Sequence, residues 1–334
     1  MSFLPTDEQR AFARSLDAML SASDTPAAVR AWAGGHPGPG RALWGRLAEA
    51  GVWALAVPEA YDGVGPLPVE LAQAFVELGR HAVPGPVVET VATAVLLGEL
   101  ARLGEPGPAK RLLPGLASGE WTATLAIAGT ESERHPVPYA LDADRADAVL
   151  VVRGEELWRA PGHGPVEVSA DPARRLARPE PGGELLAEGT AVAVAAGHAR
   201  RLATLATAAQ SLGVGRALLD RTVAYARQRT QFGTPIGAFQ AVKHRLADTL
   251  LALEFAGPLV FGAAVTSAEG DVAAAKVAAG EAGYAAARTA LQIHGAVGYT
   301  EELDLSLWLR KARPLRDAWG DPAACRAAVL GACS

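Results

Sequence analysis

The sequence predicts a mainly α-helical protein with a small central β domain. Apolar residues recur with helical periodicity through the first third of the 334-residue chain, and the same rhythm returns in the last part. Between these parts, from about Trp121, short apolar runs alternate with Asp, Arg, Gly and Pro, as is typical of short strands and their turns. This order of helices, strands and helices also indicates three regions along the chain.

Residues 1–117 are expected to form an N-terminal helical domain. Thr6, followed by Asp7 and Glu8, is typical of a helix start, because a threonine side chain can cap free backbone N–H groups and acids suit the first turn. Three further helical patterns follow, around Trp44, at residues 69–78 and at residues 87–103. A glycine-rich turn, residues 57–65, separates the pattern around Trp44 from the next one.

Residues 118–195 are expected to form a shortened middle β domain. We predict strands at residues 122–126, 148–152 and 155–158, and a closing strand at residues 190–195. The tract 161–189 is rich in Pro, Gly and Arg and has little periodicity, which predicts loops.

Residues 196–334 are expected to form a C-terminal helical bundle. The apolar pattern predicts helices at 206–227, 240–267, 271–292 and 303–315, and a last helix from about residue 322. Within the second of these helices, apolar residues at three-to-four spacing predict a buried stripe of Val242, Leu246, Leu250 and Leu253.

Composition excludes several classes of partner and site. A net charge of −5 gives no bulk attraction to nucleic acid or acidic membranes. The start of the sequence is not a signal peptide, and the longest apolar stretch, residues 91–97, is too short to span a bilayer. The two cysteines, Cys325 and Cys333, form neither a disulfide framework nor a metal-binding spacing. We therefore expect a cytoplasmic protein with no metal, no nucleic-acid partner and no membrane insertion.

The segment between the first two helices of the bundle, residues 227–240, holds the most specific chemistry. It interrupts the helical rhythm with Arg227, Arg229, an exposed-looking Phe232, Gly233 and Pro235. The planar fork of an arginine suits phosphate oxygens, so this break could receive a phosphate-bearing ligand. On composition alone, a solvated loop between two helices is the favoured alternative.

Three motifs, in order along the chain, resemble the acyl-CoA dehydrogenase family. The first is the N-terminal run Trp44 … Leu47 … Gly51 … Val57-Pro-Glu … Tyr61-Asp-Gly … Gly65. The second is Arg229-Thr-Gln-Phe-Gly with Pro235, Ile236 and Gln240, and the third is Gln292-Ile-His-Gly-Ala-Val-Gly-Tyr-Thr-Glu301. The resemblance covers nearly the whole chain and implies an N-terminal helical domain, a middle β-barrel and a C-terminal four-helix bundle. It also implies FAD, an acyl-CoA substrate and an electron-accepting flavoprotein.

The resemblance assigns cofactor contacts to the second and third motifs. In the family, these segments contact the FAD of a neighbouring subunit. Arg229 would contact the pyrophosphate, Gln231 and Phe232 would line its path, and Gln292 and Gly295 would meet the ADP portion. Gln240 belongs to the same motif. His294, beside the glycine turn, is expected to be a packed residue rather than a catalytic one.

Both positions at which the family carries its catalytic carboxylate differ here. Most members have Glu before Gly in the turn before the last helix, and Trp319 occupies that place. Members with the alternative base carry Glu on the helix that enters the Arg-x-x-Phe-Gly segment, where Ala203 stands. The catalytic base is therefore unknown. Asp317 and Asp321, each two residues from Trp319, are candidate substitutes if the local backbone differs, and Glu131 and Glu133 in the altered β segment 125–134 are outside candidates.

The motifs that a subunit lends to its neighbour's FAD are thus kept, and those it uses on its own flavin are altered. This pattern resembles the base-lacking subunit of actinobacterial heteromeric acyl-CoA dehydrogenases, several of which act on the CoA esters of steroid side chains. It predicts α,β-dehydrogenation of a CoA thioester with a homologous, Glu-bearing partner. Two alternatives stay open: a self-sufficient homo-oligomer with a displaced acidic base, and a non-catalytic scaffold that has lost FAD.

Overall fold

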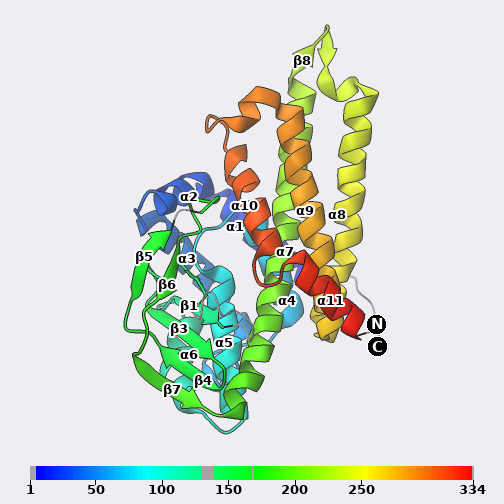
Figure 1. Ribbon diagram of the computed structural model, residues 1–334. Helices are drawn as coiled ribbons and strands as arrows, with labels where there is room; N and C mark the ends of the chain where they lie inside the picture. The colour runs from blue at the N-terminus through cyan, green and yellow to red at the C-terminus, as the bar shows by residue number, and fades with distance from the viewer. Residues whose placement is uncertain (1–4, 129–137, 168, 333–334) are drawn as a thin grey trace. The chain divides into compact units, whose positions relative to one another are not determined.

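The structure is a computed structural model that describes residues 5–128, 138–167 and 169–332. It is mainly helical with a small sheet region, as the sequence predicts (Figure 1). The chain forms two compact units, one of residues 1–26, 72–83 and 204–334, and the other of residues 27–71 and 84–203. Each unit therefore joins segments that are distant in the sequence, and each is described by itself below.

The first unit is helical. Its elements are α1 (Asp7–Ser21), α4 (Pro68–Arg80), α7 (Thr190–Gln228), β8 (Thr230–Gln231), β9 (Thr234–Pro235), η3 (Ile236–Ala238), α8 (Gln240–Thr266), α9 (Glu269–His294), η4 (Gly295–Tyr299), α10 (Leu305–Asp317) and α11 (Pro322–Ala332). Two of its helices, α4 and α7, begin in the part of the chain that belongs to the other unit. Helix α1 begins as predicted, because the Thr6 side chain accepts a hydrogen bond from the backbone N–H of Gln9. Helices α8 and α9 lie side by side, and α9 also packs on α10 and α11 (Figure 1).

The predicted closing strand at residues 190–195 is wrong, since these residues form the first turns of α7. The small apolar residues in this segment are compatible both with the two-residue period of a strand and with the 3.6-residue period of a helix. In the structure the buried ones, Val192, Ala195 and Ala199, recur every three to four residues, which is the period of a helix.

Glycines allow α7 to pack unusually close to its neighbours in the first unit. A Cβ atom on Gly213 would lie 1.9 Å from the carbonyl oxygen of Val76 on α4. A Cβ on Gly79 of α4 would lie 2.1 Å from the carbonyl oxygen of Gln210. On α9, a Cβ on Gly283 would lie 2.7 Å from the carbonyl oxygen of Ser211. At these contacts one backbone meets another, so no larger side chain fits without moving a helix.

The predicted buried stripe of α8 is wrong in part. Leu253 is buried, but Leu250 is 47% exposed, and Val242 and Leu246 are half-buried. The buried face instead carries smaller residues that pack closely, among them Thr249, Ala256, Val260 and Ala263. Four large apolar side chains of α8 therefore face solvent, with exposures of 46% to 74%: Leu250, Leu251, Phe255 and Leu259. By length and composition alone, α8 is the one helix of the described chain that would suffice to cross a membrane, and 39% of its apolar window is buried.

The second unit combines helices with two small sheets. Its helices are α2 (Thr25–Ala33), α3 (Gly38–Glu49), η1 (Trp53–Ala56), η2 (Glu59–Tyr61), α5 (Val87–Arg102) and α6 (Gly107–Ala117). Strands β1 (Ala123–Ile127), β3 (Ala148–Arg153), β4 (Glu156–Arg159) and β7 (Glu184–Glu188) form one sheet in that order, with β1 and β3 parallel. Strands β2 (Ala140–Leu141), β6 (Leu176–Pro179) and β5 (His163–Glu167) form the other, which is antiparallel.

Alternate residues of the sheets build a small apolar core, with Ala126, Val149 and Val151 from the first sheet and Ala140 and Ala177 from the second. The predicted loop tract 161–189 is wrong, because it contains β5, β6 and β7. These strands are four or five residues long and partly exposed, so their sequences lack the alternation that marks a half-buried strand.

The glycine-rich turn after η1 folds back on the chain before it. The backbone N–H groups of Gly65 and Leu67 donate to the carbonyl oxygens of Val57 and Leu55. A Cβ on Gly63 would lie 1.9 Å from the Val57 carbonyl oxygen, so this turn requires glycine. In the same motif, the Trp44 and Trp53 rings stack with centroids 3.9 Å apart. These contacts explain the residues of the N-terminal motif by packing and hydrogen bonding within their own unit.

Candidate functional site

A β-hairpin extends the end of α7 and carries the first group of predicted cofactor contacts. Strands β8 and β9 pair Thr230 with Pro235 and Gln231 with Thr234, which leaves Phe232 and Gly233 as a two-residue turn. Both turn residues have positive φ, 53° and 77°, the conformation of a type I′ hairpin turn. Arg229, at the base of the hairpin, is exposed, and its carbonyl oxygen accepts the backbone N–H of Ile236 at 2.8 Å. The hairpin thus presents its side chains to solvent on a short, defined support.

Phe232 is 94% exposed at the tip, where its ring lies edge-on to that of Phe239 with 6.3 Å between centroids. A bulky residue at positive φ costs free energy, and Asn before Gly is the preferred pair in this turn. An exposed aromatic ring in an unfavourable conformation contributes little to the stability of its own chain.

We expect Phe232→Asn to stabilise the isolated chain by about 0.5–1 kcal/mol, because asparagine adopts this backbone conformation more readily than phenylalanine. Urea unfolding of the two purified chains measures the difference. A less stable variant would contradict this reading and would mean that the Phe232–Phe239 contact outweighs the backbone cost.

The second group of predicted contacts lies where α9 ends. Gln292 is exposed, and Gly295 has φ 63° and follows the helix as its C-cap. His294 is packed, as predicted: its ring stacks on Tyr225 of α7 at 4.1 Å, and Nδ1 lies 2.8 Å from the Ala290 carbonyl oxygen. Burial lowers the pKa of His294, which favours the neutral ring.

The His294–Tyr225 stack joins the end of α9 to the last turn of α7, one turn before Arg229. Figure 1 shows the hairpin, the start of α8 with Gln240, and the end of α9 at the same end of these helices. The structure therefore gathers the two motifs that carry the predicted cofactor residues. It adds two exposed aromatic residues at this end that sequence reasoning did not select, Tyr299 at 77% and Phe239 at 37% exposure. The signal available in the sequence was a large aromatic residue one or two positions after a glycine, in Gly237-Ala-Phe239 and Gly298-Tyr299.

The residues at the two base positions have no proton-accepting side chain. Ala203 is fully buried on α7. Its neighbour Thr204 donates from Oγ1 to the carbonyl oxygen of Trp319 at 2.6 Å. Trp319 has φ 54°, and Gly320 follows at φ 127°, where a Cβ would lie 2.8 Å from Cys325 Sγ. Close packing thus requires the glycine in this turn, and tryptophan occupies the position at which a carboxylate would be needed as the catalytic base.

The two nearby aspartates both have structural partners. Asp317 is the last residue of α10 and pairs with Arg316 at 3.2 Å and with Arg313 at 4.0 Å. Asp321 caps α11, since its Oδ1 accepts the backbone N–H groups of Ala323 at 2.8 Å and Ala324 at 3.0 Å. Glu131 and Glu133, with Thr130 and Ser132 of the same segment, lie outside the described residues.

A buried lysine holds the turn that contains Trp319. Lys276 of α9 is 2% exposed, and its Nζ donates to the carbonyl oxygens of Leu315 at 3.0 Å and Arg316 at 2.7 Å. These carbonyl groups belong to the last turn of α10, which a cation suits. Burial lowers the pKa of Lys276 to about 8.

The lowered pKa gives a testable pH dependence. Below about pH 8 Lys276 is charged in both states, so the cost of burying its charge is fully present. Between about pH 8 and 10.5 the folded state loses the proton while the unfolded state keeps it, so stability rises with pH. We expect the parent protein to gain about 2–3 kcal/mol relative to Lys276→Met from pH 7 to pH 10.5, measured by urea unfolding. A difference that does not change with pH would contradict the buried, titrating ammonium.

One group of side chains in the described chain brings potential metal ligands together, although their sequence positions have no metal spacing. Ligand atoms of Asp17, Glu77 and His81 lie within 4.8 Å of one another. The Arg80 guanidinium lies 3.4 Å from Glu77 and 3.7 Å from Asp17, and His81 Nε2 lies 2.8 Å from Asp17. Arginine thus supplies the positive charge that these carboxylates require, and the group is better described as an ion-pair network.

Comparisons with known proteins agree with this geometry. Residues 6–120 match the family description "Acyl-CoA dehydrogenase, N-terminal domain", and residues 187–326 match "Acyl-CoA dehydrogenase, C-terminal domain". The chain is 33% identical to acyl-CoA dehydrogenase IpdE2 of Mycobacterium tuberculosis over 92% of each chain.

Solved structures with the same fold include two assemblies of paired proteins. One is the ChsE4-ChsE5 complex from Mycobacterium tuberculosis, with a TM-score of 0.82, 27% identity and coverage of 99% of this chain and 98% of that one. The other is the Tcur3481-Tcur3483 steroid acyl-CoA dehydrogenase, with a TM-score of 0.81, 23% identity and coverage of 98% and 99%. With matches to both family domains over most of its length, the chain belongs to the acyl-CoA dehydrogenase family of FAD-dependent oxidoreductases.

Proposed function

We propose that this chain is one subunit of a heteromeric, FAD-dependent acyl-CoA dehydrogenase whose homologous partner supplies the catalytic carboxylate. The main support for the proposal is the absence of a carboxylate at the two positions where the family has its catalytic base. Ala203 and Trp319 cannot take a proton, and the carboxylates of Asp317 and Asp321 have ion-pair or capping partners. Abstraction of an α-proton from a thioester requires a positioned base, and we infer that another chain provides it.

The exposed end of α7 and α9 supports the part of the proposal that concerns FAD, namely that this chain contributes contacts to the flavin site. A guanidinium and two amide side chains, those of Arg229, Gln231 and Gln292, are exposed there and fit the oxygens of a diphosphate. Gln240 at the start of α8, Gly295 with its open backbone and Phe232 with its exposed ring complete the proposed set of contacts. When bound, FAD accepts the hydride that leaves the substrate's β-carbon. In this arrangement the chain donates contacts to a flavin held mainly by its partner.

The solvent-facing side of α8 supports assembly with a homologous chain. Leu250, Leu251, Phe255 and Leu259 form an apolar face that no described residue of this chain covers fully. Exposed apolar faces of this kind mark interaction surfaces in soluble proteins. The similarity to the ChsE4-ChsE5 complex favours a second acyl-CoA dehydrogenase subunit as the occupant.

The substrate class and setting complete the proposal. We infer a CoA thioester with a steroid side chain, since a relative with this fold is a steroid acyl-CoA dehydrogenase. The electrons pass on to an electron-accepting flavoprotein, and the assembly works in the cytoplasm. The divisions 1–117, 118–195 and 196–334 remain our proposal for the domains.

Co-expression tests this proposal. The chain purified alone is expected to contain little FAD and to oxidise no acyl-CoA. Co-purification with a Glu-bearing homologue is expected to give a yellow complex that dehydrogenates a steroid side-chain CoA ester. Replacing that homologue's Glu by Gln should abolish turnover while flavin stays bound. Turnover by the lone chain would overturn the proposal.

If the lone chain is active, a displaced base becomes the function to test. Asp317→Asn and Asp321→Asn then identify the acid, because only one of them should abolish turnover without loss of flavin. A stable assembly that never takes up FAD with any partner would instead assign a scaffold.

A further inference from the structure

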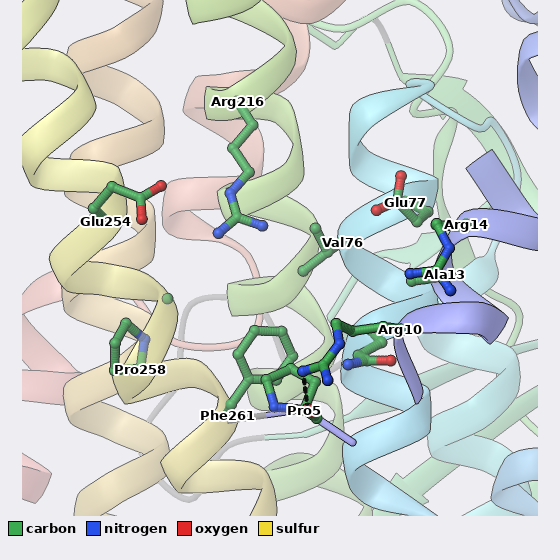
Figure 2. Close-up of a pocket in the computed structure, with 12 residues that line it drawn as sticks. Pro5, Arg10, Ala13, Arg14, Val76, Glu77, Arg216, Glu254, Pro258 and Phe261 are labelled. Atoms are coloured by element: carbon green, nitrogen blue, oxygen red, sulfur yellow. Dashed lines mark hydrogen bonds between the residues drawn. The ribbon is translucent and has the colours of Figure 1, made fainter. Parts of the chain in front are cut away.

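A cavity of about 450 Å³ lies within the first unit, against α1, α4, α7 and α8 (Figure 2). Its size is within the range of pockets that hold small organic ligands. Side chains of both charges line it, the arginines Arg10, Arg14 and Arg216 and the glutamates Glu77 and Glu254, together with apolar Val76 and Phe261.

The cavity is remote from the groups assigned above to flavin and base chemistry. Arg216 lies 13 residues from Ala203 and 13 residues from Arg229 in the sequence. At the rise of an α-helix, this places it about 20 Å along α7 from either. The cavity lining includes none of the proposed cofactor contacts and neither base position.

Arg216 is the central charged group. Figure 2 shows its side chain reaching from α7 between Glu254 on α8 and Glu77 on α4. It is half-buried and within electrostatic range of Glu77, but it makes no hydrogen bond and no ion pair within 4 Å with any residue that the structure describes. A Cβ on Gly257 of α8 would lie 3.4 Å from Arg216 Nη2, so the glycine leaves room for the guanidinium. A half-buried guanidinium without a hydrogen-bonded partner has lost part of its hydration and gains from an anion that it can hydrogen-bond.

The other charged side chains of the cavity determine which ligand charge it favours. Glu77 has a cation of its own, Arg80, at 3.4 Å. Arg14 has no ion pair among the described residues, and neither does Glu254. Arg10, which also lines the cavity, pairs with Asp7 at 2.6 Å. Arg14 and Arg216 against Glu254 therefore leave the cavity one positive charge in excess, which favours a monoanion over a dianion.

Gln73 adds a neutral hydrogen-bonding group. It lines the cavity and is 4% exposed, and its Oε1 has no hydrogen-bond partner in the described part of the chain. An unpaired buried oxygen is costly, so a ligand with an O–H or N–H group would gain by donating to it. Val76 and Phe261 supply apolar contact for the body of such a ligand.

We propose that this cavity binds a small organic monoanion, with its carboxylate between Arg14 and Arg216 and its apolar body against Val76 and Phe261. The site is separate from the acyl-CoA reaction and does not depend on the function proposed above. Its ligand class is an apolar carboxylic acid.

Calorimetric titration of the full chain with benzoate tests this site, with the uncharged isostere benzamide and the cation benzylammonium as matched ligands. Benzoate is expected to bind once per chain with a dissociation constant of about 1 mM or lower. Benzamide is expected to bind at least about tenfold more weakly, because it lacks the charge that the guanidinium groups recognise. Equal affinity for benzoate and benzamide, or no binding of benzoate, would overturn the proposal.

Variants with opposite expected effects on affinity distinguish a loss of ligand recognition from a loss of folded protein. Arg216→Met and Arg14→Gln are each expected to weaken benzoate about tenfold, whereas Glu254→Gln should tighten it severalfold by removing a like charge. Arg288→Met, an exposed arginine of α9 outside the cavity, is the control and should bind as the parent does. Because Arg14 is exposed on α1, its variant keeps the test valid if Arg216→Met fails to fold. Preferred binding of benzylammonium, weakened by Glu254→Gln, would assign a cation site and reject the monoanion.

Discussion

Replacement of Arg229 by methionine is expected to lower the FAD affinity of the proposed complex by about 10- to 100-fold. A hydrogen bond between a guanidinium and a phosphate contributes about 1.5–3 kcal/mol, and methionine keeps the length of the side chain without the charge. Arg229 is exposed at the base of a hairpin, so its side chain is not needed for the fold of its own unit. Titration of the flavin-free complex with FAD, followed by the change in flavin fluorescence, gives the affinity directly.

Arg245→Met serves as the matched control, because Arg245 is an exposed arginine of α8 outside both motifs. It should leave the affinity for FAD unchanged. The Arg229 variant should also show a weaker dependence of FAD affinity on salt, since one phosphate contact is lost. Equal affinities of the Arg229 variant and the parent would remove Arg229 from the flavin site.

Replacement of Gly213 by alanine is expected to destabilise the chain by about 4 kcal/mol or more. The added Cβ would lie 1.9 Å from the carbonyl oxygen of Val76 and 2.8 Å from the backbone nitrogen of Arg80. A flexible side chain could turn away from such a contact, but backbone atoms of α4 can move only if the helix moves. Thermal and urea unfolding of the two proteins measure the loss.

Gly197→Ala is the matched control on the same helix, since a Cβ there would meet no atom within 4 Å. Alanine has a higher helix propensity than glycine, so this variant should be about 0.5–1 kcal/mol more stable than the parent. If both variants behaved alike, close backbone packing at Gly213 would not be the reason for the glycine.

Strong periodic patterns and end signals predicted most of the helical fold. Thr6 caps α1, and Leu71, Phe75 and Leu78 of α4 are buried, although residues 71–79 of this helix are buried on every side. The order of motifs predicted the family, because spacing over a whole chain is far more specific than any one motif. Prediction failed where local sequence is compatible with two structures. After Thr190, residues 191–195 are all small and apolar, and the period of burial becomes visible only when the neighbouring elements are known.

Other features arise from contacts that no local pattern contains. Leu250 and Leu253 are equally apolar, yet one is exposed and the other buried, because α9 covers only one side of α8. The role of Lys276 depends on carbonyl groups about 40 residues away, at the end of α10. Sequence reasoning identified the absence of a carboxylate at Ala203 and Trp319. It could not show that Asp321 caps a helix, since that depends on the backbone geometry of the turn.

The apolar face of α8 has a consequence for how stability should be defined for this protein. Free energy gained when Leu251, Phe255 and their neighbours leave water is obtained only on association, and association depends on concentration. The unfolding temperature of the chain would then be a property of the solution, rising with the amount of partner. The cell would control the lifetime of this chain through the synthesis of another, because chains made in excess would keep the face exposed to chaperones and proteases.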